Sequence, residues 1–140
     1  MIAVFLIYGL AFFSLGLIIA IYPRRHSKFQ LAKNAWLVAA FGILHGLNEW
    51  ADMFLIIQRP FETAHLQIIR SVLLPVSFVF LLLFGIKSLP GSINRHIRFG
   101  ALPIILIVLW ILIVLTSSRH MLMADIGARY LLAAPGIALT

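Results

Sequence analysis

Long apolar stretches joined by short polar ones make up almost the whole chain. These stretches contain two charged residues at most and cover residues 1–22, 34–57, 64–86, 99–116 and 125–140. About 20 apolar residues in an α-helix cross a hydrocarbon core of roughly 30 Å. The pattern therefore predicts an all-α fold, a polytopic transmembrane bundle of about five spans that forms a single domain. The last stretch is short for a crossing, so we expect the fifth span to be truncated.

The amino-acid composition agrees with a membrane location and excludes several kinds of chemistry. Hydrophobic residues make up 63% of the 140 residues and charged residues only 11%, a balance unlike that of a water-soluble globule. The lipid bilayer is therefore the first partner that we expect. The chain has no cysteine, which excludes disulfides, thiolate metal ligands and a thiol nucleophile.

The basic residues predict the orientation of the chain in the membrane. The formal net charge is +7, and most basic residues fall in two connections: Arg24, Arg25, Lys28 and Lys33 in the first, and Lys87, Arg95 and Arg98 in the second. Because loops rich in lysine and arginine remain in the cytoplasm, we expect the N-terminus outside and the last stretch running inward. This placement indicates topology and no nucleic-acid partner, and leaves additional binding of anionic lipid open.

The second stretch contains an unusual polar cluster in the sequence FGILHGLNEWADMF, residues 41–54. The cluster consists of His45, Asn48, Glu49 and Asp52. The three ionisable members fall within one arc of about 140° of an α-helix. A position inside a membrane is costly for such groups unless they are paired or line a functional site.

Two glycines share this arc with the ionisable residues. Gly42 and Gly46 form a G-x-x-x-G pair, which lets a neighbouring helix approach closely. The face that carries the polar cluster is therefore the packing face, and we expect its side chains to point into the bundle.

Helix depth brings two arginines to the level of the acidic residues. Running outward, the second stretch places Glu49 and Asp52 about 12 and 8 Å below its outer end. Arg70 and Arg129 enter the third and fifth stretches from the outside at a similar depth. Two interpretations follow: the cluster fixes helix register through ion pairs, or it lines a cavity that senses a ligand or a proton. In the second interpretation His45 titrates in the physiological range.

Two further residue types limit the possible mechanisms. Pro75 and Pro135 lie inside spans, where proline bends a helix, and are candidate hinges. His45 has no second histidine at its depth to hold a haem, and His45 with Glu49 provides too few ligands for most metals. We therefore expect no metal, no cofactor and no catalytic residue in this chain, which we expect not to be an enzyme.

Three segments together resemble a known kind of membrane region. FGILHGLNEWADMF, SFVFLLLFGIKSL and ARYLLAAPGIAL resemble the N-terminal multi-span input regions of bacterial sensor proteins, which precede PAS, histidine kinase or diguanylate cyclase modules. The residues that carry the resemblance are His45, Gly46, Glu49, Trp50, Ser77, Phe84, Gly85, Arg129, Tyr130, Pro135 and Gly136. The resemblance implies a signal-input domain in the bacterial cytoplasmic (inner) membrane, with its output module in the cytoplasm.

The sequence thus predicts a membrane-embedded sensor domain of a signal-transduction protein such as a two-component histidine kinase. The signal is a small ligand or a proton, and a homodimer is a further possibility. Two alternatives stay open. One is a small transporter or channel subunit whose charges line a pathway, and the other is a haem-binding electron-transfer subunit.

Overall fold

The computed structural model describes residues 2–22, 30–58, 64–88, 102–116 and 126–138. Within these ranges the chain is helical and contains no strand, which confirms the all-α prediction. Four α-helices come first: α1 (Ile2–Ile21), α2 (Gln30–Ile57), α3 (Ala64–Ser88) and α4 (Leu102–Thr116). The last described range contains a π-helix, η2 (Ala128–Ala133), followed by α6 (Ala134–Ala138).

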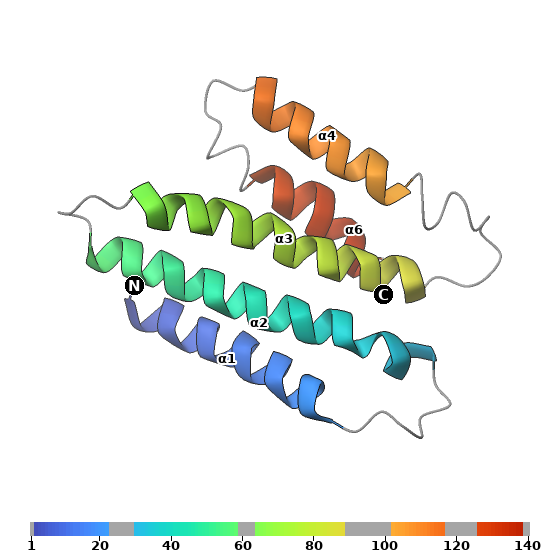
Figure 1. The fold of residues 1–140 in the computed structure, drawn as a ribbon, viewed down its shortest axis with the longest axis horizontal. Helices are drawn as coiled ribbons and strands as arrows, with labels where there is room; N and C mark the ends of the chain where they lie inside the picture. The colour runs from blue at the N-terminus through green and yellow to red at the C-terminus, as the bar shows by residue number, and fades with distance from the viewer. Residues whose placement is uncertain (1, 23–29, 59–63, 89–101, 117–125, 139–140) are drawn as a thin grey trace.

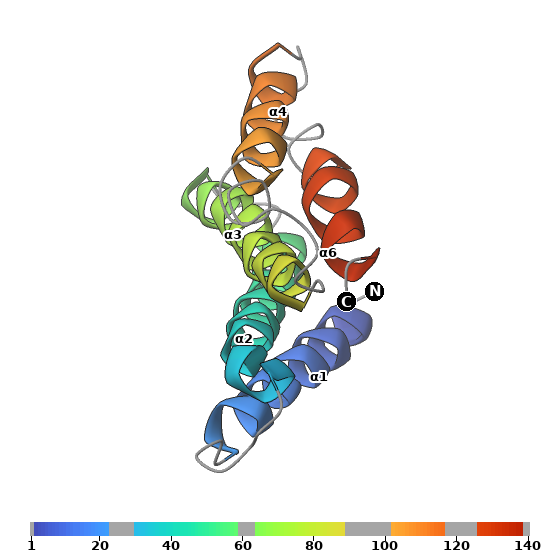
Figure 2. The ribbon, with the colours of Figure 1, turned by 90° about the vertical axis from the view of Figure 1, so that its right-hand side faces the viewer.

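Successive helices run in alternate directions. Figure 1 shows α1, α2 and α3 side by side and antiparallel, with η2 and α6 packed against α3. Figure 2 shows α1 to α4 following one another in a curved layer, with η2 and α6 on one side of it. The ends of α1 and α3 and the starts of α2 and α4 lie at the same end of the bundle. The two connections that are rich in basic residues therefore leave from one end.

Glycines on both helices allow α1 and α2 to approach each other. A Cβ atom added to Gly42 would lie 2.8 Å from the carbonyl oxygen of Phe12, and one added to Gly46 would lie 2.7 Å from that of Gly9. Real Cβ atoms are not found below 3.0 Å from such atoms, and the same limit applies at Gly16. Gly42 and Gly46 thus have the close-packing position that the sequence predicts, and α1 is the helix that packs there.

The main apolar core lies between α3 and the last helical segment. α3 contributes a stripe of residues four positions apart, and the segment opposite contributes small and branched side chains: Leu74, Phe78, Leu82 and Ile86 meet Ala128, Leu132 and Ala133. Such a repeat places all four α3 residues on one helix face. Gly136 adds a close approach, because a Cβ there would lie 3.0 Å from the backbone nitrogen of Leu82.

Two described helices, Ile2–Ile21 and His65–Ser88, are long and apolar enough to cross a membrane. This is fewer than the five or so that the sequence pattern predicts. α2 has 28 residues, but its polar cluster lowers its hydropathy, and α4 has only 15 residues. The described residues therefore form an all-α bundle in which two apolar helices are long enough to span a membrane.

The expected fifth span, over residues 125–140, is an interrupted helix in its described part. The N–H of Ala134 donates to the carbonyl oxygen of Arg129, five residues earlier, as in a π-helix. Pro135 follows directly; it has no N–H to donate, and its ring crowds the carbonyl of Leu131. The wider π-turn therefore ends where the proline constrains the backbone. Pro75, the other candidate hinge, lies inside a continuous α3.

Candidate functional site

His45 lies where α1, α2 and α3 meet. Its ring centroid is 4.7 Å from that of Phe12, 5.1 Å from that of Phe41 and 5.3 Å from that of Phe78. Its Nδ1 atom is 3.4 Å from Ser77 Oγ. Since the three rings come from three different helices, His45 is an anchor of the packing as well as a polar group.

The hydrogen bonds around His45 turn its second ring nitrogen towards Glu49. Ser77 Oγ donates to the carbonyl oxygen of Leu74 at 2.7 Å, so the hydroxyl proton is already used and His45 Nδ1 donates to Ser77. His45 Nε2 lies 3.6 Å from Glu49 Oε1. Without a further proton, two acceptors would face each other there. A proton on either residue would remove this repulsion, so the contact between the two groups depends on their protonation.

Asp52 and Arg70 form an ion pair between α2 and α3. The contact joins Asp52 Oδ1 to Arg70 Nε, and the two side chains are mostly buried, 16% and 22% exposed respectively. Removing one partner of such a mostly buried ion pair leaves the other charge uncompensated, which is strongly destabilising. The predicted meeting of an acidic residue of α2 with an arginine of α3 at one level is therefore present.

Arg129 belongs to η2, which packs on α3, and it lines the same pocket as the residues of the cluster. It belongs to the π-helical turn, and its side chain is exposed. Arg129 interacts electrostatically with both His45 and Glu49. It forms no ion pair within 4.0 Å among the residues that the structure describes. The predicted direct pairing of Arg129 with an acidic residue is thus not part of this arrangement, because the π-turn and the exposed position leave the guanidinium at a greater distance.

A pocket of about 420 Å³ lies among these groups. We name it the polar pocket; it is lined by Val4, Phe5, Tyr8, Phe12, His45, Glu49, Asp52, Phe78 and Arg129. α1 supplies an apolar and aromatic wall, α2 supplies the three ionisable residues at spacings of four and three, and η2 supplies the arginine. This volume falls in the range of small-molecule sites, which are about 300–1,000 Å³.

Asn48 does not line the polar pocket, although the sequence groups it with the sensing residues. Its side chain is 1% exposed, and neither its amide nitrogen nor its amide oxygen has a hydrogen-bond partner in the described part of the chain. Asn48 follows Phe41 by seven residues and so lies on the same helix face, towards α3. Its position indicates a role between α2 and α3 and not contact with a ligand in this pocket.

The aromatic wall is the part of the site that the sequence does not reveal. Tyr8 and Phe12 are four residues apart, with ring centroids separated by 5.9 Å, so they share one face of α1. α1 is apolar on every side, however, and no periodicity distinguishes the wall from the surface that faces lipid. The only sequence signal is the pair of glycines, Gly9 and Gly16, which are the buried residues of α1.

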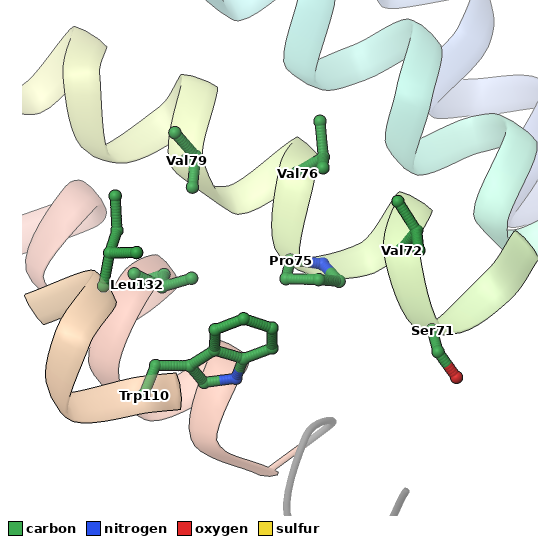
Figure 3. Close-up of a pocket in the computed structure, with 8 residues that line it drawn as sticks. Ser71, Val72, Pro75, Val76, Val79, Trp110 and Leu132 are labelled. Atoms are coloured by element: carbon green, nitrogen blue, oxygen red, sulfur yellow. The ribbon is translucent and has the colours of Figure 1, made fainter. Parts of the chain in front are cut away.

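A second, apolar pocket of about 240 Å³ lies on the far side of α3. Figure 3 shows Val72, Pro75, Val76 and Val79 of α3 along one side of it and Trp110 of α4 across from Pro75, with Leu132 of η2 beside them. Pro75 therefore has open volume next to its ring, where a bend of α3 could be accommodated.

Within the described residues, no group of three or more histidine, aspartate or glutamate side chains could hold a metal ion. His65 of α3 is exposed, and the remaining histidines lie outside the described residues. The site thus offers charged and aromatic groups around a pocket and no ligand set for a metal. Comparisons with family models, with curated proteins and with solved structures find no match to this chain.

Proposed function

We propose that this chain is the membrane-embedded signal-input domain of a bacterial sensor protein, and that the polar pocket receives the signal. In this proposal the helices lie in the bacterial inner membrane with the N-terminus outside. The more polar α2 and the shorter last helices lie within the same bundle, where α2 packs between α1 and α3 and η2 packs on α3. An output module, such as a histidine kinase, is joined on the cytoplasmic side.

The observation that carries this proposal is the polar pocket itself. Ionisable groups inside a membrane bundle are expensive, and they are the default candidates for function when they face a cavity. The Asp52–Arg70 ion pair explains two of the charges as structural. His45, Glu49 and Arg129 also face the pocket. An ion pair that fixes the helix register does not account for these three residues.

The exposed surface of the bundle supports a location in lipid. Large apolar side chains on α1 and α4 are exposed along most of each helix, as with Ile7, Ile18, Ile104 and Leu115, each more than 60% exposed. A water-soluble protein rarely exposes apolar patches of this extent. In a bilayer these side chains face hydrocarbon, at no cost.

The end of the bundle that carries the basic connections has the features of a membrane interface. Lys33 is exposed there, and Lys87 Nζ lies 5.6 Å from the ring centroid of Trp36. Tryptophan and lysine concentrate where hydrocarbon meets headgroups, and lysine-rich loops remain in the cytoplasm. The polar pocket, which lies towards the other end of α2, is then on the outer side.

The mechanism that we propose is a choice between two packings of the same helices. A ligand or proton in the polar pocket contacts α1, α2 and α3 on one side and η2 on the other, so it stabilises one relative position of these helices over another. Pro75 and Pro135 are the candidate hinges. The π-turn at Arg129 adds a point where the backbone can change its hydrogen bonding, and such turns are frequent at functional sites.

A transporter or channel subunit is the less favoured alternative. Among the described residues, the polar groups of the α2 interface lie between His45 and Asp52, towards one end of the helix. Towards the other end the same interface is apolar, with Leu37 1% exposed and the rings of Trp36 and Phe80 6.2 Å apart. Ion selectivity comes from rings of carbonyl or charged groups, and the described residues show acidic groups at one end of this interface only, so the alternative is less favoured.

The test is a chimera of this chain with a histidine kinase reporter. Glu49→Gln keeps the size of the side chain and removes its acidic group. We expect it to shift the basal output of the reporter and to flatten its response to external acidification, by about fivefold or more. Thr116→Val is the matched control, because it removes a polar group from an exposed position of α4 far from the pocket.

An unchanged basal output and response in Glu49→Gln, at normal abundance in the membrane, would remove the polar pocket from signalling. A change of equal size in Thr116→Val would show that the reporter detects general perturbation and would count against the proposal as well.

A further inference from the structure

Arg129 differs from the other charged residues of the polar pocket in its lack of a direct partner. Asp52 is paired with Arg70. His45 Nε2 faces Glu49 Oε1 at 3.6 Å. Arg129 places a positive charge on the wall of the pocket, with no ion pair within 4.0 Å among the described residues.

The position of Arg129 suits the binding of an anion. Its side chain is exposed, it lines the pocket, and it forms no ion pair within 4.0 Å in the part of the chain that the structure describes. The guanidinium group presents a planar fork of N–H donors that matches a carboxylate or a phosphate oxygen pair. A cation in the same pocket would be repelled by this guanidinium group.

The rest of the wall suits an apolar body. Val4, Phe5, Tyr8 and Phe12 of α1 lie on one side, and Phe78 of α3 closes the deeper part near His45. Pockets of this volume bind small molecules mainly through apolar surface, with a few polar groups that orient them. A ligand with one charged group at Arg129 and an apolar body along α1 would match both parts of the wall.

We propose that the polar pocket binds a small organic monoanion, with its carboxylate or phosphate on Arg129 and its apolar body against the aromatic wall of α1. This inference rests on the function proposed above for the same pocket and names the class of its ligand. The anion can be a free carboxylate of the fatty-acid type or the phosphate of an anionic lipid, since the chemistry at Arg129 is the same.

The experiment uses the full chain in nanodiscs of phosphatidylcholine and three probes with the same eight-carbon body: octanoate, octanol and octylamine. Isothermal titration calorimetry measures their affinities. We expect octanoate to bind at least about tenfold more tightly than the other two, a difference of about 1.4 kcal/mol. Arg129→Gln should abolish this preference, Arg129→Lys should retain part of it, and Lys33→Gln should leave it unchanged.

A second series of titrations identifies the source of the anion. Short-chain phosphatidylglycerol that displaces octanoate at lower concentration than short-chain phosphatidylcholine does, in an Arg129-dependent way, assigns the site to anionic lipid. Octanoate binding without such displacement assigns it to a free carboxylate. Both results support the inference.

Equal affinities for octanoate, octanol and octylamine, together with no preference for phosphatidylglycerol, would overturn the inference. So would a preference that persists in Arg129→Gln. Circular dichroism confirms that each variant keeps its helices. A reporter response that depends on Glu49 while octanoate and phosphatidylglycerol fail to bind contradicts this inference alone. Binding at Arg129 without any Glu49-dependent output contradicts the proposed function alone.

Discussion

Residues of the polar cluster differ in what they do, although they lie within two turns of one helix. Asp52 is committed to Arg70 of α3, whereas Glu49 is next to His45 and faces the polar pocket. Asn48 is buried on the side facing α3. A helix turns by about 100° per residue, so neighbouring polar residues reach different partners. The role of each residue therefore follows from its angular position and not from its polarity.

The Asp52–Arg70 ion pair can be tested with a double-mutant cycle. Asp52→Asn leaves the Arg70 guanidinium without its anionic partner in a mostly buried position, and we expect a loss of about 3 kcal/mol in the free energy of unfolding. The double variant Asp52→Asn with Arg70→Gln should lose less than the sum of the single losses. Unfolding of the chain in mixed micelles, followed by circular dichroism, measures all three values. Additive losses would mean that the two residues are not coupled.

The residue scale also shows what the sequence could predict of the site. Helix depth predicts that Asp52 and Arg70 lie at one level, because the rise per residue is fixed, but it does not select Asp52 over Glu49 as the partner. The approach of Arg129 is predicted only in part, since its exact distance depends on the π-turn. The aromatic wall of α1 is not predictable, because a helix that is apolar on all sides gives no sign of which face is buried.

Among the elements, α1 and α2 form the closest pair. Their contact depends on glycines, so the backbones meet directly, and small residues are the usual means of helix association where lipid surrounds the bundle. The sequence identifies Gly42 and Gly46 through their spacing. It does not identify α1 as their partner, because Gly9 and Gly16 are seven residues apart and show no G-x-x-x-G pattern.

Enlarging one of these glycines should separate the two helices. In Gly46→Leu the new side chain meets the carbonyl oxygen of Gly9 and the backbone of Phe13, both within 2.8 Å of the added Cβ. We expect a loss of at least about 2 kcal/mol in unfolding free energy, as in other overpacked sites. Ala11→Leu, which adds similar bulk at an exposed position of α1, is the control and should change little. Equal stability of both variants would contradict the close contact.

The sequence predicts only part of the structure of the last helical segment. Its helical character over residues 126–138 follows from the apolar pattern, and its interruption follows from Pro135. The π-helical form of Ala128–Ala133 does not follow, because a proline can also produce a kink or a helix end. The structure packs this segment on α3 through Leu132 and Ala133.

At the scale of the whole molecule, the pattern of charges predicts the helix directions better than the apolar pattern predicts the number of spans. The alternating direction of the helices agrees with the expected repeated crossing, and the basic connections leave from one end. Two helices have the apolar length of a span, fewer than the pattern predicts. The polar cluster of α2 and the 15-residue length of α4 set these two helices apart from α1 and α3.

The absence of cysteine makes the orientation directly testable. Single cysteines at Gln58, after α2, and at Lys33, near its start, should react differently with a membrane-impermeant maleimide. We expect Gln58→Cys to react in intact cells and Lys33→Cys only after permeabilisation, because the basic end stays in the cytoplasm. The reverse result would invert the topology, and equal reaction at both sites would show that α2 does not cross the membrane.

The glycine contacts between α1 and α2 have a mechanical consequence for the whole bundle. Backbones that touch directly leave no side chains between them to re-pack, so this pair moves as one stiff unit. η2, by contrast, packs mainly on α3 through side chains, and it carries Arg129 on the wall of the polar pocket. If the proposed signal-input function holds, we therefore expect a molecule that widens or narrows the space beside Arg129 to displace η2 more readily than α1 and α2.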